Sequence, residues 1–300
     1  MSDILNNGED QKYPASPVIE IDTYRPTEMS EKVALVGVAK TSPDTLTMLF
    51  LSILAGIFIA LGTQLFIVVT HTATSNFGLY QLIGGIAFTL SMVLVVITGA
   101  ELFNGNCLVV MSFMAKKITG QALTRNLIIA FVGNFVGALT IVVLIYNSDL
   151  WMTNNHLLGA KIVLMANDKV NTPPGVVFIQ GVMGNALLCL GVWMCYCGRS
   201  TIDKILALLW PVSCLMACGF EHCVVNMWLI PMGIALKGDS AVLAAAEMIH
   251  GGTPDLSNLT CFKGFLIDNL FPVVLGNLFG GIALIAGAYW FVYLHPSKKE

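Results

Sequence analysis

The chain has 300 residues, of which 56% are hydrophobic and 11% are charged, and its formal net charge is −3. Soluble domains carry about 25% charged side chains, so this composition excludes an ordinary soluble domain. The mean hydropathy of +0.78 indicates an integral membrane protein in contact with a lipid bilayer. No basic run suggests a nucleic-acid partner, and we expect no cofactor.

Two segments precede the first apolar run. Residues 1–26 are polar and acidic and include Pro14 and Pro17, which predicts a disordered tail on the cytoplasmic side. Residues 27–41 contain Thr27 as a capping residue and apolar side chains at helical spacing. We therefore predict an amphipathic helix at the membrane interface over 27–41, with a plain linker as the alternative.

Six apolar segments follow, bounded by turn residues, and each is long enough to cross a bilayer as a helix. They cover residues 46–71, 79–115, 122–146, 176–197, 202–236 and 265–294. The second and the fifth exceed the ~20 residues that one span needs, and each contains a polar interruption. We predict that both are broken into two half-helices, because irregular backbone is tolerated inside a membrane where it lines a cavity.

The two interruptions resemble each other, and so do the third and sixth apolar segments. The matching motifs are Gly99-x-Glu101 with Gly219-x-Glu221, and Gly-Asn-x-x-Gly at 133–137 with the same pattern at 276–280. Matches of this kind indicate an internal repeat. Since each copy has three spans, the second copy must enter the membrane upside down. We therefore predict an all-α protein with two inverted three-helix repeats, at 45–150 and 174–295.

The distribution of positive charge gives the chain an orientation. With the N-terminus inside, most of the 15 lysines and arginines fall on the cytoplasmic side. Positively charged loops remain in the cytoplasm. We predict that both termini, including a short tail at 296–300, face the cytoplasm from a plasma (inner) membrane.

The second interruption places Glu221, His222 and Asn226 in the middle of an apolar segment. Ionisable groups at this depth are costly and usually face a cavity or a pathway. A half-helix that starts beside His222 would also direct its free N–H groups into the bilayer centre, where they attract anions. This combination predicts a site for a small anion with His222 at its centre. The alternative is a histidine that only bridges helices.

The other polar groups near the interruptions have less direct roles. Glu101 and Glu221 are predicted to support the breaks by accepting free N–H groups of the half-helices, because a bare carboxylate would repel an anion. Three cysteines between positions 214 and 223 match no closed zinc pattern in their spacing. We therefore expect no metal site.

Four motifs in this chain are together similar to the motifs of one known family. They are Gly-Ala-Glu-Leu-Phe-Asn-Gly-Asn at 99–106, Gly-Asn-Phe-Val-Gly-Ala at 133–138, Cys-Gly-Arg-Ser at 197–200 and Gly-Phe-Glu-His-Cys-Val-Val-Asn-Met-Trp-Leu-Ile-Pro-Met-Gly at 219–233. Together they resemble the formate/nitrite transporter family, and its formate channels most closely, over nearly all of the chain after Pro26. The resemblance implies an aquaporin-like arrangement of six spans and a homopentamer in which each subunit has its own pore.

The resemblance also implies roles for individual residues. The expected sites are a central pore with His222, Asn104, Asn226 and Asn185, an outer constriction with Leu102, Leu215, Leu188 and Phe103, an inner constriction with Phe88 and Met92, and an anion-attracting Lys169. Asn104 stands where the family commonly has threonine, and Leu215 stands where formate channels often have phenylalanine. Considered alone, Lys169 could also be a solvated loop charge.

Two apolar constrictions around a polar chamber would exclude hydrated ions but pass a small weak acid. Histidine suits such a chamber because its unperturbed pKa of ~6.5 lies near physiological pH. We therefore predict a transport protein, not an enzyme, that carries small monovalent anions with protons in a pH-dependent way. Formate is the first expectation, and nitrite, hydrosulfide, acetate and lactate are the alternatives within the same family.

Two other classes of function remain open. An aquaporin-like neutral-solute channel would share the broken helices, although neither interruption contains Asn-Pro-Ala and no arginine lies near the pore centre. A membrane enzyme could use Glu101, Glu221 and His222 as acid and base groups. No nucleotide loop or nucleophile constellation accompanies these residues, so the enzyme is the last choice.

Overall fold

The computed structural model describes residues 23–72 and 76–295, and within these ranges the secondary structure is helical, without strands. The predicted tail at 296–300 and most of the predicted tail at 1–26 lie outside the described residues. The predicted all-α class is therefore confirmed for the part of the chain that the structure describes.

The first half of the chain contains three long helices and several short ones. Its elements are α1 (Pro26–Thr41), α2 (Thr45–Thr70), α3 (Phe77–Thr98), α4 (Phe103–Asn106), η1 (Cys107–Val109), α5 (Val110–Met114), α6 (Gly120–Asn147) and η2 (Leu150–Met152). Asp44 caps α2, because its Oδ1 accepts the N–H groups of Leu46 and Thr47 at 3.0 and 3.1 Å. Gly99 ends α3 in the left-handed region, with a φ of 77°.

The second half repeats this succession with different connections. Its elements are α7 (Leu157–Asn171), α8 (Pro174–Cys195), α9 (Thr201–Ala217), α10 (Cys223–Leu236), α11 (Ser240–His250), η3 (Cys261–Leu270), α12 (Phe271–Leu278), η4 (Phe279–Gly287) and α13 (Ala288–Tyr293). The last four join into one helix over Cys261–Tyr293, in which η3 and η4 are π-helical. Gly219 follows α9 with a φ of 70°, as Gly99 follows α3.

Several of these helices are suited to a lipid bilayer. Among the described residues, α2, α3, α6, α8 and the helix over Cys261–Tyr293 are long and apolar enough to cross a membrane. The pair α10 and α11 passes the same criteria if counted together, with a bend of 111° between them. These helices indicate an integral membrane protein.

The sequence does not predict α7 and α11, because both are shorter than a membrane span. They have 15 and 11 residues and lie between longer apolar helices in the chain. Lys169 belongs to the last turn of α7. The alternative in which Lys169 is a loop charge is therefore wrong.

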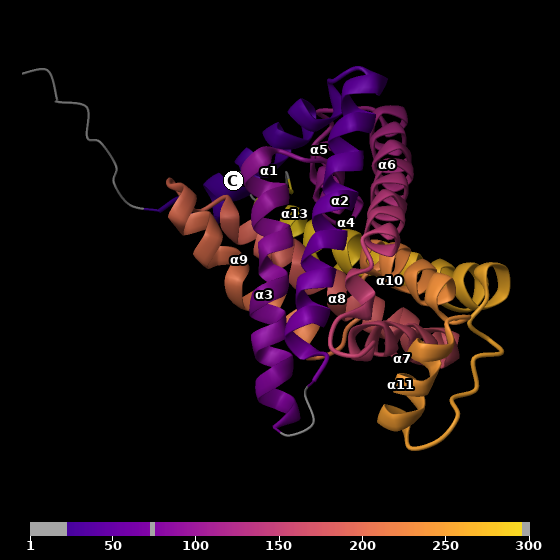
Figure 1. The fold of residues 1–300 in the computed structure, drawn as a ribbon. Helices are drawn as coiled ribbons and strands as arrows, with labels where there is room; N and C mark the ends of the chain where they lie inside the picture. The colour runs from indigo at the N-terminus through magenta and orange to yellow at the C-terminus, as the bar shows by residue number, and fades with distance from the viewer. Residues whose placement is uncertain (1–22, 73–75, 296–300) are drawn as a thin grey trace, which may run out of the picture.

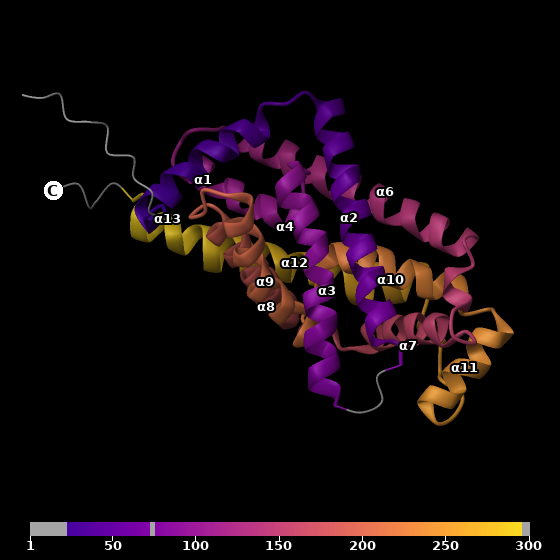
Figure 2. The same ribbon diagram turned by 60° about the vertical axis from the view of Figure 1, so that its left-hand side comes forward.

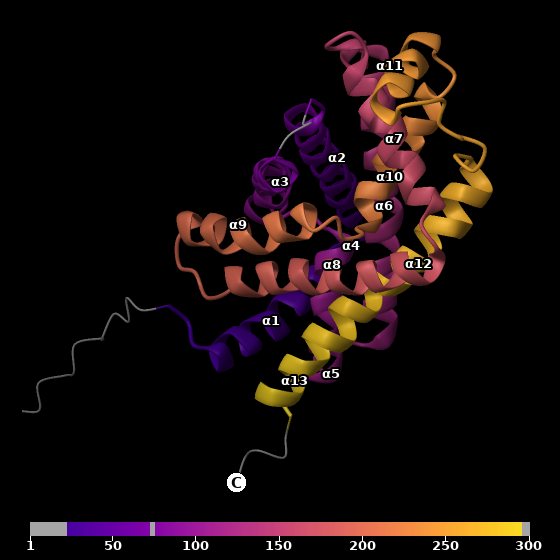
Figure 3. The same ribbon diagram turned by 90° about the horizontal axis from the view of Figure 1, so that it is seen from below.

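The helices of the two halves cross each other around a shared core (Figure 1). In the first half α2 packs against α3 and α6, and in the second half α8 packs against α9 and α12. Figures 2 and 3 show α8 and α9 as neighbours along their length. Contacts between α3 and α9 join the halves. The same pairing of elements therefore occurs twice.

The Gly-Asn-x-x-Gly motifs lie where helices approach each other closely. A Cβ added at Gly137 of α6 would overlap the carbonyl oxygen of Ile53 in α2. A Cβ added at Gly280 would overlap the carbonyl oxygen of Val182 in α8. Small residues at such crossings let backbones pack directly. The asparagine of each motif is thereby brought against the chain of the opposite helix.

Candidate functional site

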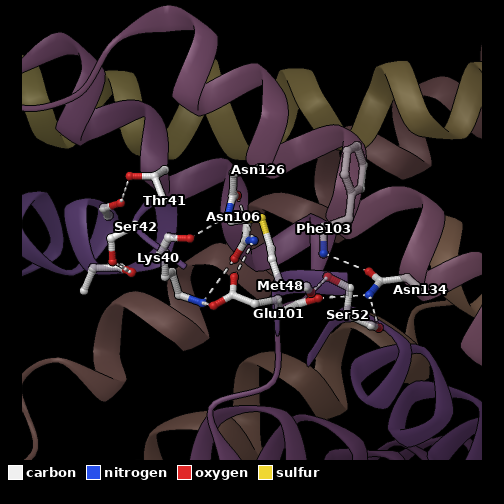
Figure 4. Close-up of polar contacts among 12 residues, drawn as sticks. Lys40, Thr41, Ser42, Met48, Ser52, Glu101, Phe103, Asn106, Asn126 and Asn134 are labelled. Atoms are coloured by element: carbon white, nitrogen blue, oxygen red, sulfur yellow. Dashed lines mark hydrogen bonds and ion pairs between the residues drawn. The ribbon is translucent and has the colours of Figure 1, made fainter. Parts of the chain in front are cut away.

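The first irregular stretch lies between α3 and α4 and is held by one asparagine of α6 (Figure 4). Asn134 Nδ2 donates to the carbonyl oxygens of Ser52 and Glu101 at 2.7 and 2.9 Å. Its Oδ1 accepts the N–H of Phe103 at 2.9 Å. A buried backbone group without a partner costs about 1–3 kcal/mol. Asn134 therefore supplies hydrogen-bond partners to backbone groups in and beside this irregular stretch.

The carboxylate of Glu101 lies beside this stretch within a network of polar side chains (Figure 4). Lys40 Nζ lies 3.0 Å from its Oε1, and Asn106 Nδ2 donates to its Oε2 at 2.7 Å. Asn106 also contacts Lys40 Nζ and Asn126 at 3.2 and 2.9 Å. Asn126 Nδ2 donates to the carbonyl oxygen of Lys40 at 3.0 Å. The buried negative charge is thus paired, which a carboxylate in an apolar setting requires.

The second irregular stretch, between α9 and α10, is held by an asparagine in the same way. Asn277 Nδ2 donates to the carbonyl oxygens of Gly181 and Glu221 at 2.9 and 3.0 Å. Its Oδ1 accepts the N–H of Cys223, the first residue of α10, at 2.9 Å. Asn277 is fully buried, as is Asn134. Each break therefore depends on one side-chain amide from a distant helix.

The carboxylate of Glu221 also lies in a matching network. Lys169 Nζ lies 2.7 Å from its Oε1, and Asn226 Nδ2 donates to its Oε2 at 2.5 Å. Asn226 Nδ2 also donates to Asn269 Oδ1 at 2.7 Å. Asn269 Nδ2 donates to the carbonyl oxygen of Lys169 at 3.1 Å. Lys169 is therefore a partner of Glu221, with its side chain largely enclosed.

The two networks correspond residue by residue. The pairs are Lys40 with Lys169, Glu101 with Glu221, Asn106 with Asn226, Asn126 with Asn269, and Asn134 with Asn277. The sequence predicts that the glutamates accept the free N–H groups of the breaks. That prediction is wrong for Phe103 and Cys223, whose N–H groups go to asparagines.

Sequence reasoning missed six members of these networks as site residues. They are Lys40, Asn106, Asn126, Asn134, Asn269 and Asn277. A signal for most of them was present, because an asparagine inside an apolar segment is costly unless its amide is hydrogen-bonded. The two asparagines of the Gly-Asn-x-x-Gly motifs entered the sequence analysis only as part of the internal repeat. Lys40 had no such signal, because it lies at the end of a surface helix.

The two breaks meet through two of the predicted pore residues. Asn104 Nδ2 donates to Asn277 Oδ1 at 2.8 Å, and Cys223 Sγ lies 3.2 Å from Asn104 Oδ1. Asn185 Nδ2 donates to the carbonyl oxygen of Asn277 at 2.7 Å. Asn104 and Asn185 are fully buried. The Asn104 amide thus connects the two halves of the protein, and the Asn185 amide holds the backbone of Asn277 beside it.

His222 has one ring nitrogen without a hydrogen-bond partner, and Asn226 Oδ1 is a second buried polar atom of the site without one. The side chain is buried, with 1% of the residue exposed, and it caps α10. Nδ1 accepts the N–H of Val225 at 3.3 Å. Nε2 has no hydrogen-bond partner among the described residues. Since Nδ1 acts as the acceptor, the neutral ring carries its hydrogen on Nε2. The site therefore contains a buried N–H donor that can serve a small acceptor.

A cavity of about 330 Å³ opens beside the first break. Its wall is formed by α1, α3, η1 and the adjoining ends of α8 and α9. Three lysines line it, namely Lys32, Lys40 and Lys204. Lysines of α1 and α9 therefore add positive charge to the wall of the cavity.

Two of the predicted constriction residues line this cavity. Met92 and Leu102 both line it, whereas Phe88, Leu188 and Leu215 are buried elsewhere in the core. The resemblance to the family places Leu102 and Met92 in different constrictions, and in the structure both residues line this one cavity.

The cysteines near His222 do not converge. Cys214 and Cys218 are exposed, with their Sγ atoms 3.8 Å apart, whereas Cys223 is buried against Asn104. Among the described residues no three His, Cys, Asp or Glu side chains gather closely enough to hold a metal ion.

Residues 27–291 match the family model described as formate/nitrite transporter. The chain belongs to the formate/nitrite transporter family. Formate channel FocA of Escherichia coli (strain K12) is 36% identical over 280 residues, which cover 93% of this chain and 98% of that protein. Formate channel FocB of the same strain is 32% identical, over 90% of this chain and 94% of that protein.

A solved structure agrees with this assignment. The structure described as a pentameric formate channel with formate bound is similar with a TM-score of 0.73 and 32% identity. The match covers 84% of this chain and 98% of that chain. The formate/nitrite transporter family consists of channels and transporters, so the predicted class is confirmed and the chain is not an enzyme.

Proposed function

We propose that this formate/nitrite transporter is a channel for small monovalent weak-acid anions, formate first, with pH-dependent passage past His222. The observation that carries the proposal is the buried imidazole, whose Nε2 lacks a hydrogen-bond partner among the described residues. Relatives named formate channels, and a similar structure described with formate bound, support formate as the anion.

Local electrostatics favour an anion beside this imidazole. α10 begins at Cys223, immediately after His222, so its N-terminal end lies next to the ring. A helix N-terminus attracts negative charge. Lys169 offsets the carboxylate of Glu221, which would otherwise repel the substrate. In this proposal Lys169 attracts anions mainly by removing that repulsion.

The pH dependence follows from the apolar parts of the pathway. The proposed constrictions are formed by Leu102, Leu215, Leu188 and Phe103 on one side, and by Phe88 and Met92 on the other. A charged anion loses its hydration there, whereas the neutral acid loses far less. Passage with a proton is therefore favoured as the pH falls. His222 Nε2–H holds the anion while the proton is supplied.

We further propose six membrane spans arranged as two inverted repeats in an aquaporin-like fold. The second span would combine α3 with α4, η1 and α5, and the fifth would combine α9 with α10. The support is the pair of matching networks, whose members come from corresponding elements in the two halves. Under this arrangement α1 and α7 are equivalent helices that each supply one lysine.

The proposed assembly is a homopentamer in the plasma (inner) membrane with both termini in the cytoplasm. The similar structure is described as pentameric. The orientation is supported by the distribution of lysine and arginine along the sequence. α1 then lies on the cytoplasmic side, beside the cavity that contains Lys40.

Other substrates and one other class of channel remain as alternatives. The alternative substrates are, like formate, monovalent anions of weak acids, namely nitrite, hydrosulfide, acetate and lactate. An aquaporin-like channel for neutral solutes would share the fold. Competition among the anions in one uptake assay ranks the substrates, and swelling in glycerol tests the neutral-solute class.

The test is formate flux into proteoliposomes containing the wild type or His222→Phe, measured from about pH 5 to 8. We expect wild-type flux to rise as the pH falls. His222→Phe should start from a lower flux at neutral pH and rise more steeply, because the anion is no longer held while the proton is supplied. His250→Phe, which changes an exposed histidine at the end of α11, is the matched control and should behave as wild type. An unchanged pH profile in His222→Phe would remove the imidazole from the mechanism.

A further inference from the structure

A second cavity, of about 640 Å³, lies between α1, the end of α5 and the end of the last helix. Figures 1 and 3 show α1, α5 and α13 side by side at this place. Polar groups on its wall come from Lys116, Lys117, Trp290, His295 and Glu31. None of these residues belongs to the networks around His222. We call this cavity the basic cavity.

The basic cavity carries an excess of positive charge. Lys116 and Lys117 are exposed, and neither forms an ion pair with another described residue. Glu31 is the acidic side chain on the same wall. Two ammonium groups against one carboxylate favour an anionic ligand. A phosphate group is well matched, because it accepts several hydrogen bonds at once.

The backbone at Lys116 is unusual for a lysine. Its φ is 57°, and the turn has the hydrogen bonds of a Schellman motif, from Lys116 N–H to Phe113 O at 2.9 Å and from Lys117 N–H to Ser112 O at 2.8 Å. Glycine is the residue that this position favours. Folding alone therefore does not account for the lysine, and the turn holds two adjacent ammonium groups at the cavity wall.

Trp290 provides an observation, independent of the lysines, that favours a ligand at the basic cavity. Its indole Nε1 is buried and has no hydrogen-bond partner among the described residues. The ring of His295 stands edge-on to it, with centroids 5.1 Å apart. Tryptophan is enriched at membrane interfaces because its ring is apolar and its N–H is polar. The buried N–H is thus a donor without an acceptor, on a residue that lines the basic cavity.

We propose that the basic cavity binds the headgroup of an anionic glycerophospholipid. Its phosphate oxygens accept from Lys116, Lys117 and the Trp290 N–H, and an acyl chain lies along α1 at Leu35, which is 59% exposed. The apolar wall beside the lysines favours a lipid over free phosphate. The cytoplasmic leaflet is the source under the orientation proposed above, and anionic lipids concentrate there.

The test is lipid retention by the purified full-length protein in detergent, measured by native mass spectrometry. Phosphatidylglycerol, phosphatidylcholine and inorganic phosphate are added separately. We expect the wild type to prefer phosphatidylglycerol. The double variant Lys116→Gly/Lys117→Gln should bind it about tenfold more weakly or worse. Trp290→Phe, which keeps a ring but removes the N–H, should weaken binding about threefold.

Controls separate a lipid site from general charge and from misfolding. Lys263→Gln removes an exposed lysine outside the cavity and should leave phosphatidylglycerol binding unchanged. Lys116→Gly alone should keep or raise the melting temperature, since glycine suits the turn. Glu31→Gln should tighten binding.

Four outcomes would overturn the proposal. They are equal retention of phosphatidylglycerol and phosphatidylcholine, unchanged binding in both cavity variants, an equal loss in Lys263→Gln, and displacement of the lipid by inorganic phosphate at equal concentration. The experiment does not depend on transport. Absence of formate flux in the wild type would remove the proposed function and leave the lipid result standing.

Discussion

At the scale of single residues, Asn134 and Asn277 replace the backbone partners that a continuous helix would provide. Each donates to two backbone carbonyl oxygens and accepts one backbone N–H, and both lie in the long helix that follows the irregular stretch in their half. An amide is suited to this because it carries donors and an acceptor on one group. An aliphatic side chain of the same size would leave all three backbone groups unpaired.

We therefore expect Asn277→Leu to destabilise the protein by about 2 kcal/mol or more. The measurement is thermal unfolding of the detergent-solubilised protein. Asn147→Leu is the control, because Asn147 is exposed and its Nδ2 bonds only to Val143 O in its own helix. Equal melting temperatures for Asn277→Leu and wild type would show that the break does not need this amide.

The pairing of Lys169 with Glu221 leads to a second expectation. Removing one partner of a buried ion pair typically costs about 3–5 kcal/mol, whereas removing both costs far less. Lys169→Met should therefore lower the melting temperature strongly, and Lys169→Met/Glu221→Gln should recover much of the loss. Additive effects in this double-mutant cycle would contradict the pairing. Lys263→Met, at an exposed ion pair, should have little effect.

At the scale of elements, the helix crossings position the breaks. Asn277 reaches the second break because Gly276 and Gly280 allow the last helix to lie directly on the backbone of α8. The same relation holds between Gly137 and α2 in the first half. The short helices α1 and α7 complete the arrangement by supplying the lysines. The close helix crossings thus bring the asparagines of the networks to the backbone groups that they bind.

Gly280→Ala should lower thermal stability, because the added Cβ would overlap the carbonyl oxygen of Val182. Overpacking of this kind costs about 1–3 kcal/mol, which exceeds the gain in helix propensity. Gly175→Ala is the matched control, since it lies in the first turn of α8 with open space around its Cβ position. If Gly280→Ala were as stable as Gly175→Ala, the last helix and α8 could move apart without a loss of thermal stability.

At the scale of the whole molecule, two halves with the same pairing of elements meet across α3 and α9. If they are inverted copies, equivalent positions must lie on opposite sides of the membrane. The Lys40 network and the Lys169 network then approach the centre from the cytoplasmic and the external side. The side of the membrane on which each end of the helices lies can therefore be tested.

A membrane-impermeant maleimide should label Cys261 from outside intact cells, because this exposed cysteine begins the helix over Cys261–Tyr293 on the predicted external side. In a Cys261→Ser background, Gln121→Cys should react only after permeabilisation, since Gln121 starts α6 on the predicted cytoplasmic side. Cys261→Ser alone is the control. The reverse pattern would invert the proposed orientation.

The sequence by itself determined the all-α membrane class, the apolar segments, the two polar interruptions and the family. These depend on local composition and on short motifs, which need no knowledge of distant contacts. It also singled out His222, because an imidazole in an apolar segment is conspicuous. It did not identify α7 or α11, which are too short to stand out as membrane spans.

Only the tertiary structure decided which polar groups are partners. Lys40 and Glu101 are 61 residues apart, and Asn104 and Asn277 are 173 apart, yet both pairs are in contact. Hydrogen bonds of this kind are set by helix crossings, and no local pattern encodes them. The same reason explains why Leu102 and Met92 line one cavity. It also explains why His222 Nε2 and Asn226 Oδ1 have no hydrogen-bond partner among the described residues, whereas the carboxylates of Glu101 and Glu221 are bound.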